Sequence, residues 1–393
     1  MKKAVQICIL SVLLLSFGTT LCVYAGKLPL VSRTSRDART AGDADRDGSV
    51  TLHDAAVIAR YLADGWDVSI DENAADVNAD KAVDLKDAVL LRRYLAGGWD
   101  VVLVWPEDAE LPRIAAGETA VEKSIFVDQN GDTAVIPAEM TVSAKADEQI
   151  IAQGLVVIGA DGSEFVWVPT TVTPLATRDF GSYFSGGGSL SGYGDETELN
   201  AYREMVRSVA QYGGFYMGRY EASKGADGLP ASRRVTSGEP GQIWVRFSPQ
   251  DTVAACEALY AQNDTVQGFF PWGINWDTTL QWLIDSGCKT KEEVASDSTG
   301  WGNYSNDTFS AGATGIYTGA WEKAKANNIY DLAGNNWEWT QERYSSNYVM
   351  RGGGYNLMGG ACPGSRYPAA LRDPLPGNNH HPNVTFRVAL YVK

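Results

Sequence analysis

The sequence predicts a multidomain protein, in which a small all-α calcium-binding module of two loop-helix units precedes a larger, irregular α+β domain. An acidic loop and the helix after it occur twice, beginning at Asp43 and again at Asp76. Beyond this repeat, short strand patterns alternate with short helix patterns and long loops, which is typical of α+β domains. The 393 residues also exceed the length of one typical domain.

Residues 1–25 have the pattern of a signal peptide. Lys2 and Lys3 precede the short apolar run Ile9–Phe17, and Ala25 offers a small residue for cleavage. An uncleaved anchor is the alternative, but the run is too short for a typical transmembrane helix. We therefore expect a secreted protein without a membrane span after signal removal, which begins with a polar spacer at residues 26–40.

The net charge and the cysteine content limit the kinds of partner and the disulfide bonds that the protein can have. The formal net charge of −15 argues against nucleic acid as a partner, because phosphate binding needs a basic surface. Three cysteines, Cys256, Cys288 and Cys362, follow the signal peptide, and none belongs to a CxxC pair. Two interpretations of Cys256 and Cys288 stay open: a disulfide between them, or two separate small buried residues.

The first acidic loop has the ligand spacing that a single Ca²⁺ ion needs. Oxygen-bearing side chains occupy loop positions 1, 3, 5 and 12, and Gly48 allows the sharp turn at position 6. A helix pattern begins directly after the loop, with apolar residues three or four positions apart on one face. The expected ligands are Asp43, Asp45, Asp47, Ser49, Thr51 and Asp54.

The second loop fills the same positions, and its helix ends in the same Arg-Tyr-Leu-Ala sequence. The expected ligands are Asp76, Asn78, Asp80, Ala82, Asp84 and Asp87. Lys81 stands where the first loop has Gly48. Because positive φ costs a non-glycine residue about 1 kcal/mol, we expect the second site to bind Ca²⁺ more weakly than the first.

Two loop-helix units of this kind, with Asp at position 12, make residues 41–104 resemble a type I dockerin. The resemblance implies a module that is folded by Ca²⁺ in both loops and docks into a cohesin domain of a scaffoldin or a bacterial cell-surface protein. The family contacts its cohesin at loop positions 10 and 11, which are Leu52, His53, Leu85 and Lys86 here. They differ from the Ser-Thr pair of cellulosomal dockerins, so the type of cohesin stays open.

Residues 105–141 are predicted to contain a linker and a first hairpin, because two prolines flank an acidic stretch and an Asn-Gly pair separates two strand patterns. A second, mostly apolar hairpin follows. The expected strands are Ser124–Val127, Thr133–Ile136, Leu155–Ile158, Glu164–Val168 and Phe215–Glu221. The expected helices are Glu196–Gln211, Pro249–Ala261 and Asp277–Ile284.

Residues 142–393 carry a series of motifs: Gly214–Glu221, Asn275–Asp277, Asn328–Trp339, Arg351–Tyr355 and Phe386–Val388. In this order they resemble a formylglycine-generating enzyme, or sulfatase-modifying factor, domain. The resemblance implies a compact, irregular α+β fold related to C-type lectins. The family's aerobic enzymes oxidise a sulfatase cysteine with copper held by two cysteines. The resemblance therefore implies that an active member needs both cysteines.

One of the two copper positions lacks a thiol. The first falls at Leu357 and the second at Cys362. Since a single thiolate cannot form a two-sulfur copper site, we do not expect the oxidase activity. Cys362 remains a weak catalytic candidate, and a remnant of a degenerate site is the favoured interpretation. An iron site of three histidines is excluded, because this domain has only His380 and His381.

The family's structural Ca²⁺ site, in contrast, has matching residues here. By resemblance, its ligands are the side chains of Asp331 and Glu338 and the backbone carbonyls of Gly334 and Asn336. Asp331 adds a negative charge where the family has Asn, which favours a dication. The alternative is a hydrogen-bonded turn that holds no ion.

The sequence therefore predicts a calcium-dependent binding protein rather than an enzyme. Its dockerin attaches a catalytically degenerate, lectin-like domain to a cell surface or a cellulosome-like assembly, and that domain binds a polysaccharide or a protein. Candidate contact loops are Asp264–Trp276, Trp301–Tyr317 and Asn356–Pro382. The alternatives are a formylglycine-generating-type enzyme with altered chemistry on a protein cysteine, and a structural display module.

Overall fold

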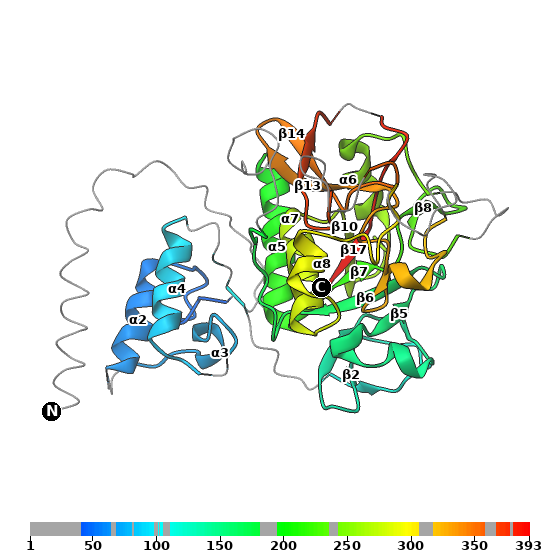
Figure 1. Ribbon diagram of the computed structural model, residues 1–393. Helices are drawn as coiled ribbons and strands as arrows, with labels where there is room; N and C mark the ends of the chain where they lie inside the picture. Colours follow the sequence, from blue (N-terminus) through cyan, green and yellow to red (C-terminus); the bar gives the residue numbers. More distant parts are fainter. Residues whose placement is uncertain are drawn as a thin grey trace. The chain divides into compact units, whose positions relative to one another are not determined.

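The chain divides into two compact units, Met1–Glu107 and Asp108–Lys393 (Figure 1). The computed structural model describes residues 41–63, 68–80, 82–97, 101, 103–104, 111–180, 195–235, 243–305, 317–357, 367–377 and 380–393. The predicted signal peptide, the spacer and Cys362 lie outside these ranges. Within them, no helix is long and apolar enough to cross a membrane.

The described part of the smaller unit is helical. Its helices are α2 (Leu52–Leu62), α3 (Glu72–Ala75) and α4 (Leu85–Leu95). The two predicted helices, α2 and α4, lie side by side (Figure 1) and bury matching positions: Ala55 and Ile58 on α2, Ala88 and Leu91 on α4. The short α3 was not predicted, and Asp71 caps its first turn.

A six-stranded sheet forms the centre of the larger unit. Its strand order is β10-β17-β7-β6-β5-β4, and all neighbouring strands are antiparallel. The strands are β4 (Thr141–Val142), β5 (Val156–Ile158), β6 (Glu164–Pro169), β7 (Gly214–Gly218), β10 (Val266–Phe269) and β17 (Ala389–Val392). The predicted second hairpin is confirmed as β5 and β6, and the strand expected at Phe215–Glu221 is β7, which ends earlier.

Both faces of this sheet are buried, which explains why its strands are apolar without alternation. One face contributes to a first core with Leu155, Val157, Phe165, Trp167 and Tyr216. The opposite face contributes to a second core with Val156, Val166, Val168, Phe215 and Met217. Successive side chains of a strand point to opposite faces, so each strand supplies both cores.

Four helices lie in the described part of the larger unit. They are α5 (Glu196–Tyr212), α6 (Pro249–Ala258), α7 (Gly273–Asp285) and α8 (Lys291–Ala295). The three predicted helices are confirmed as α5, α6 and α7, with altered ends. Asp195 caps the start of α5 through the backbone N–H of Glu198, and Gly213 ends the helix with a φ of 74°. α5, α7 and α8 pack on the second core, whereas α6 packs on the first.

Smaller sheets surround this centre. Their strands are β1 (Arg113–Ile114), β2 (Ser124–Val127), β3 (Thr133–Ile136), β8 (Ser223–Lys224), β9 (Pro230–Ala231), β11 (Lys325–Ala326), β12 (Ile329–Tyr330), β13 (Trp337–Tyr344), β14 (Asn347–Arg351), β15 (Asp373–Leu375) and β16 (Val384–Phe386). Single 3-10 turns occupy Ala146–Glu148, Ile151–Gln153 and Glu322–Ala324. The predicted first hairpin is confirmed as β2 and β3, and its Phe126 and Ile136 lie in the first core of the larger unit.

Three of the five motifs, Asn328–Trp339, Arg351–Tyr355 and Phe386–Val388, meet at one four-stranded sheet, with the order β15-β14-β13-β16. β13 pairs antiparallel with β14 and parallel with β16. This register places Glu338 opposite Arg351 and also opposite Thr385. Segments that are far apart in the sequence, including Asn328–Trp339 and Phe386–Val388, are thereby brought to one place.

Candidate metal centres

The first acidic loop gathers three carboxylates at one point. Ligand oxygens of Asp43, Asp45 and Asp47 all lie within 4.8 Å of one another. The backbone turns sharply here, because Arg46 and Gly48 have φ angles of 62° and 87°. The N–H of Gly48 donates to Oδ2 of Asp43 (3.1 Å), and the N–H of Asp47 donates to Oδ1 of Asp45 (3.0 Å).

One buried oxygen in this loop has no hydrogen-bond donor among the described residues. Oδ1 of Asp43 is buried and accepts no hydrogen bond from any described residue. Burial raises the pKa of the Asp43 carboxyl, and repulsion from the neighbouring carboxylates adds to the effect. A buried acceptor without a donor lowers the stability of the folded state, and so does the repulsion between clustered carboxylates. A hard dication removes both costs, so the loop fits Ca²⁺.

The residues at loop positions 9 and 12 connect each loop to its helix. Oγ1 of Thr51 accepts the N–H of His53 (3.1 Å), and the buried Asp54 accepts the N–H of Thr51 (2.8 Å) and of Asp45 (3.2 Å). Thr51 and Asp54 form a capping box at the start of α2, in which each side chain accepts the backbone N–H of the other residue. Asp84 and Asp87 form the same box at the start of α4.

The second loop has a similar pattern of Asx turns. The N–H of Asp80 donates to Oδ1 of Asn78 (2.8 Å) and to Oδ1 of Asp76 (3.1 Å), and the N–H of Ala82 donates to Oδ1 of Asp80 (3.1 Å). Lys86 places its ammonium 3.5 Å from Asp80 and 3.2 Å from Asp84. Lys81 lies outside the described residues, so the expected positive φ at this position stays a prediction.

We expect Lys81→Gly to tighten Ca²⁺ binding at the second loop by roughly fivefold. The substitution removes a cost of about 1 kcal/mol for positive φ in the bound loop. Calorimetric titration of the full chain resolves the weaker site, and Ala82→Gly, one position later in the same loop, is the control. An unchanged affinity of the weaker site in Lys81→Gly contradicts the prediction.

A second candidate centre lies in the larger unit, around Asp331. Oδ2 of this buried residue accepts the hydroxyl of Thr318 (3.0 Å) and the N–H of Gly319 (2.8 Å). Its Oδ1 is buried and has no donor among the described residues. Positive φ angles at Asp331 (59°), Gly334 (68°) and Asn335 (57°) curl the chain into the expected turn.

Two further carboxylates interact electrostatically with Asp331. Glu338 binds the guanidinium of Arg387, with Oε1 2.5 Å from Nη2 and Oε2 3.1 Å from Nε. Glu221 accepts the side-chain amide of Asn335 (2.5 Å) and the N–H of Asn336 (2.9 Å). Glu221 lies in one of the sequence motifs but has no role that spacing could predict, because its partners are more than 100 residues away.

The charges of this cluster do not balance. Among the described residues, Glu221, Asp331 and Glu338 face one guanidinium, that of Arg387, and all four side chains are buried. Burial raises the pKa of Glu338 to about 7, and burial together with repulsion from Asp331 and Glu338 raises the pKa of Glu221 well above its usual range. The surplus of negative charge, together with the free Oδ1 of Asp331, fits a bound dication.

We expect Asp331→Ala to abolish calcium-dependent stabilisation of the larger unit. A ligand present at 100 times its dissociation constant stabilises the folded state by about 2.7 kcal/mol, and Asp331 supplies the free oxygen, which alanine lacks. Hydrogen exchange of the β13 amides, with and without calcium, reports on this unit alone. Asp227→Ala, at an exposed turn, is the matched control. Equal calcium protection in Asp331→Ala and the control contradicts the assignment.

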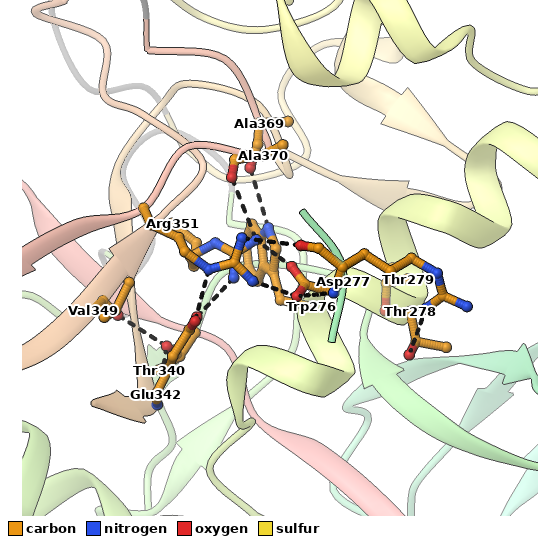
Figure 2. A network of polar contacts seen from close by, with 12 residues as sticks. Trp276, Asp277, Thr278, Thr279, Thr340, Glu342, Val349, Arg351, Ala369 and Ala370 are labelled. Carbon is orange, nitrogen blue, oxygen red and sulfur yellow. Dashed lines mark hydrogen bonds and ion pairs between the residues drawn. The ribbon is translucent and has the colours of Figure 1, made fainter. Parts of the chain in front are cut away.

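A third cluster is charge-balanced and has no free oxygen to offer an ion. Arg351 lies 2.6 Å from Asp277 and 2.9 Å from Glu342, and Arg372 binds the same two carboxylates (Figure 2). Arg351 and Asp277 are fully buried, and Arg372 and Glu342 nearly so. The N–H of Arg178 also donates to Asp277 (2.9 Å). This network joins α7, β13, β14 and the chain around Arg372 in the interior.

The cysteines show no disulfide among the described residues. Cys256 and Cys288 are free thiols, so the alternative of a bond between them is wrong. Burial raises the pKa of the Cys256 thiol well above its usual range, which makes it unreactive. Leu357, at the first copper position, packs against the first core, and its carbonyl accepts the N–H of Ser305 (2.8 Å).

The expected ligand-contact loops contribute largely to the core where they are described. Trp272, Trp276, Trp301 and Tyr304 are all buried. The indole N–H of Trp276 donates to the carbonyl of Ala369 (3.2 Å) rather than to a ligand. Parts of the loops Trp301–Tyr317 and Asn356–Pro382 lie outside the described residues. These four aromatic side chains therefore hold the fold together and offer no flat surface to a sugar.

Comparisons with known proteins agree with both resemblances. Residues 41–96 match the model of the Dockerin type I domain, and residues 276–392 match that of the Sulfatase-modifying factor enzyme 1-like domain. The chain is therefore similar to a type I dockerin in its first unit and to a sulfatase-modifying factor domain in its C-terminal part. The α2 and α4 repeat lies within the first matched segment, and the buried network and most of the Asp331 cluster lie within the second.

Other comparisons found weak similarity. No curated protein matches the chain. The crystal structure of CarF is 14% identical, with a TM-score of 0.34, over 46% of this chain and 87% of that chain. Treponema denticola variable protein 1 is 11% identical, with a TM-score of 0.23, over 65% of this chain and 92% of that chain. Neither similarity is strong enough to indicate a shared function.

Proposed function

We propose that this is a secreted cohesin-docking protein, in which the dockerin anchors a modifying-factor domain that lacks the family's oxidase chemistry. The duplicated loop and helix carry the proposal. Ca²⁺ in the two loops supplies positive charge to oxygens that repel one another without it. Two further features hold the unit together. The position 12 carboxylates join each loop to its helix, and the two helices pack against each other through Ala55, Ile58, Ala88 and Leu91.

The docking surface is proposed to include the exposed residues next to the loops. Leu52 and Leu85 are 51% and 40% exposed. His53 and Lys86 lie beside them and are exposed as well. Immobilised full-length chain is expected to retain a purified cohesin domain in calcium and to release it in chelator. Retention that is equal in both conditions contradicts calcium-dependent docking.

The modifying-factor domain is proposed to act by binding rather than by oxidation. Leu357 supports this proposal, because its apolar side chain packs into the core where the family has a copper thiolate. The expected result is no copper-dependent oxygen consumption with a CxPxR peptide. Oxygen consumption that is abolished by Cys362→Ser overturns the proposal and favours the alternative, an enzyme acting on a protein cysteine.

The bound molecule is proposed to be a polysaccharide or a protein. Because Trp272, Trp276, Trp301 and Tyr304 are buried, the contacts must come from other residues of the domain. Selective retention on a glycan array or by a purified polysaccharide supports a lectin-like role. Absence of any retained glycan or protein favours the structural display module instead.

A further inference from the structure

We propose that the second repeat carries the main docking face of the smaller unit, and that its partner is a cohesin whose surface combines an apolar patch with acidic side chains. This proposal rests on the proposed docking function. It adds that the cohesin binds the face of the second repeat rather than the similar face of the first. The two repeats present equivalent positions to solvent, so their differences can be compared residue by residue.

Each repeat exposes a matched set of four side chains. The sets are Leu52, His53, Ala56 and Arg60 on α2, and Leu85, Lys86, Val89 and Arg93 on α4. Their spacing within each helix is the same, and the first, fifth and ninth positions lie on one side of an α-helix. The buried positions of both helices face the shared core, so each set forms a face directed away from it.

The apolar part of the face is larger in the second repeat. Val89 is 55% exposed, and its counterpart on α2 is Ala56. Together with Leu85, one helical turn earlier, Val89 forms a continuous apolar strip, whereas Leu52 has only a methyl group beside it. Contiguous exposed apolar side chains mark sites of protein–protein contact, and their removal from water contributes to the binding energy.

The charged part of the face also differs between the repeats. The second set contains two side chains with permanent positive charge, Lys86 and Arg93, and the first set contains Arg60 and the weaker base His53. Contacts with Asp80 and Asp84 hold the Lys86 ammonium over the start of α4, while 69% of its side chain stays exposed. On a chain with a net charge of −15, these cations select a partner with acidic side chains beside its apolar patch.

A pair of matched substitutions tests this assignment in the full-length chain. Val89→Glu and Ala56→Glu each place a carboxylate at the same position of the two faces. With purified cohesin domains encoded by the same organism, measured by calorimetry in calcium, we expect Val89→Glu to weaken binding at least about 30-fold and Ala56→Glu less than about threefold. Circular dichroism checks that both variants keep the helices.

The possible outcomes distinguish a wrong choice of face from a failure of cohesin docking itself. Binding by the wild type with equal losses in both variants, or with the larger loss in Ala56→Glu, overturns the assignment of the face and leaves docking intact. A wild type that binds no cohesin in calcium overturns both. The double variant Lys86→Ala with Arg93→Ala tests the role of the cations separately. Because it removes two positive charges that attract an acidic partner, we expect the association rate to fall and to become less dependent on salt. An unchanged rate contradicts the role of the cations.

Discussion

Asp54→Ala is expected to unfold the first loop and helix and to reduce cohesin binding at least about 100-fold. The two carboxylate oxygens of Asp54 accept the N–H groups of Asp45 and Thr51, and the side chain is fully buried. Each buried donor left without an acceptor costs about 1–3 kcal/mol, and loss of the helix cap adds about 1 kcal/mol. A small unit has only a few kcal/mol to lose.

Amide hydrogen exchange along α2 in the full-length chain measures this effect, because the larger unit is followed separately in the same experiment. His53→Ala is the matched control, since His53 is the neighbouring residue and is exposed. We expect rapid exchange throughout α2 in Asp54→Ala, with protection retained in the control. Protection of α2 in both variants shows that the position 12 carboxylate does not hold the loop to the helix.

Arg351→Met is expected to destabilise the larger unit by about 3–5 kcal/mol, which is the usual effect of removing one partner from a buried ion pair. Asp277 and Glu342 each bind Arg351 at less than 3 Å, and Arg372 alone then has to balance both. The remaining network of Asp277, Glu342 and Arg372 has one more carboxylate than guanidinium. Burial of an uncompensated charge is the physical cause of the loss.

Guanidinium unfolding of the larger unit measures the change in free energy. Lys325→Met removes the more exposed Lys325–Glu322 pair and is expected to cost about 1 kcal/mol or less. The double variant Arg351→Met with Glu342→Gln restores the charge balance and should recover part of the stability of Arg351→Met. A loss below about 1 kcal/mol in the single variant means that water reaches the network.

The parts of the fold that the sequence predicted are those that depend on local patterns. Helices α2 and α4 follow from loop spacing and apolar periodicity, and the hairpins β2–β3 and β5–β6 follow from turn residues between apolar runs. The four-residue α3 is too short for periodicity to show, although Asp71 is a good cap. The start of α7 at Gly273 has no side-chain capping hydrogen bond from Trp272, so it gave no sequence signal.

The polar interior could not be predicted from spacing, because its partners meet only in the folded chain. Arg351 and Asp277 are separated by 74 positions, and Arg372 and Asp277 by 95. Glu221 contributes a third carboxylate to the Asp331 cluster from a distant strand end. Composition also could not tell which aromatic residues of the candidate contact loops are exposed, and Trp276, for example, is buried.

Calorimetric titration of a purified cohesin into the full-length chain tests calcium-dependent docking most directly. The wild type is compared in calcium and in chelator, beside Asp43→Ala with Asp76→Ala, which removes the first ligand of both loops. We predict tight one-to-one binding in calcium, and no detectable binding by the wild type in chelator or by the double variant in calcium. Binding of the same affinity in all three cases contradicts a calcium-built docking module.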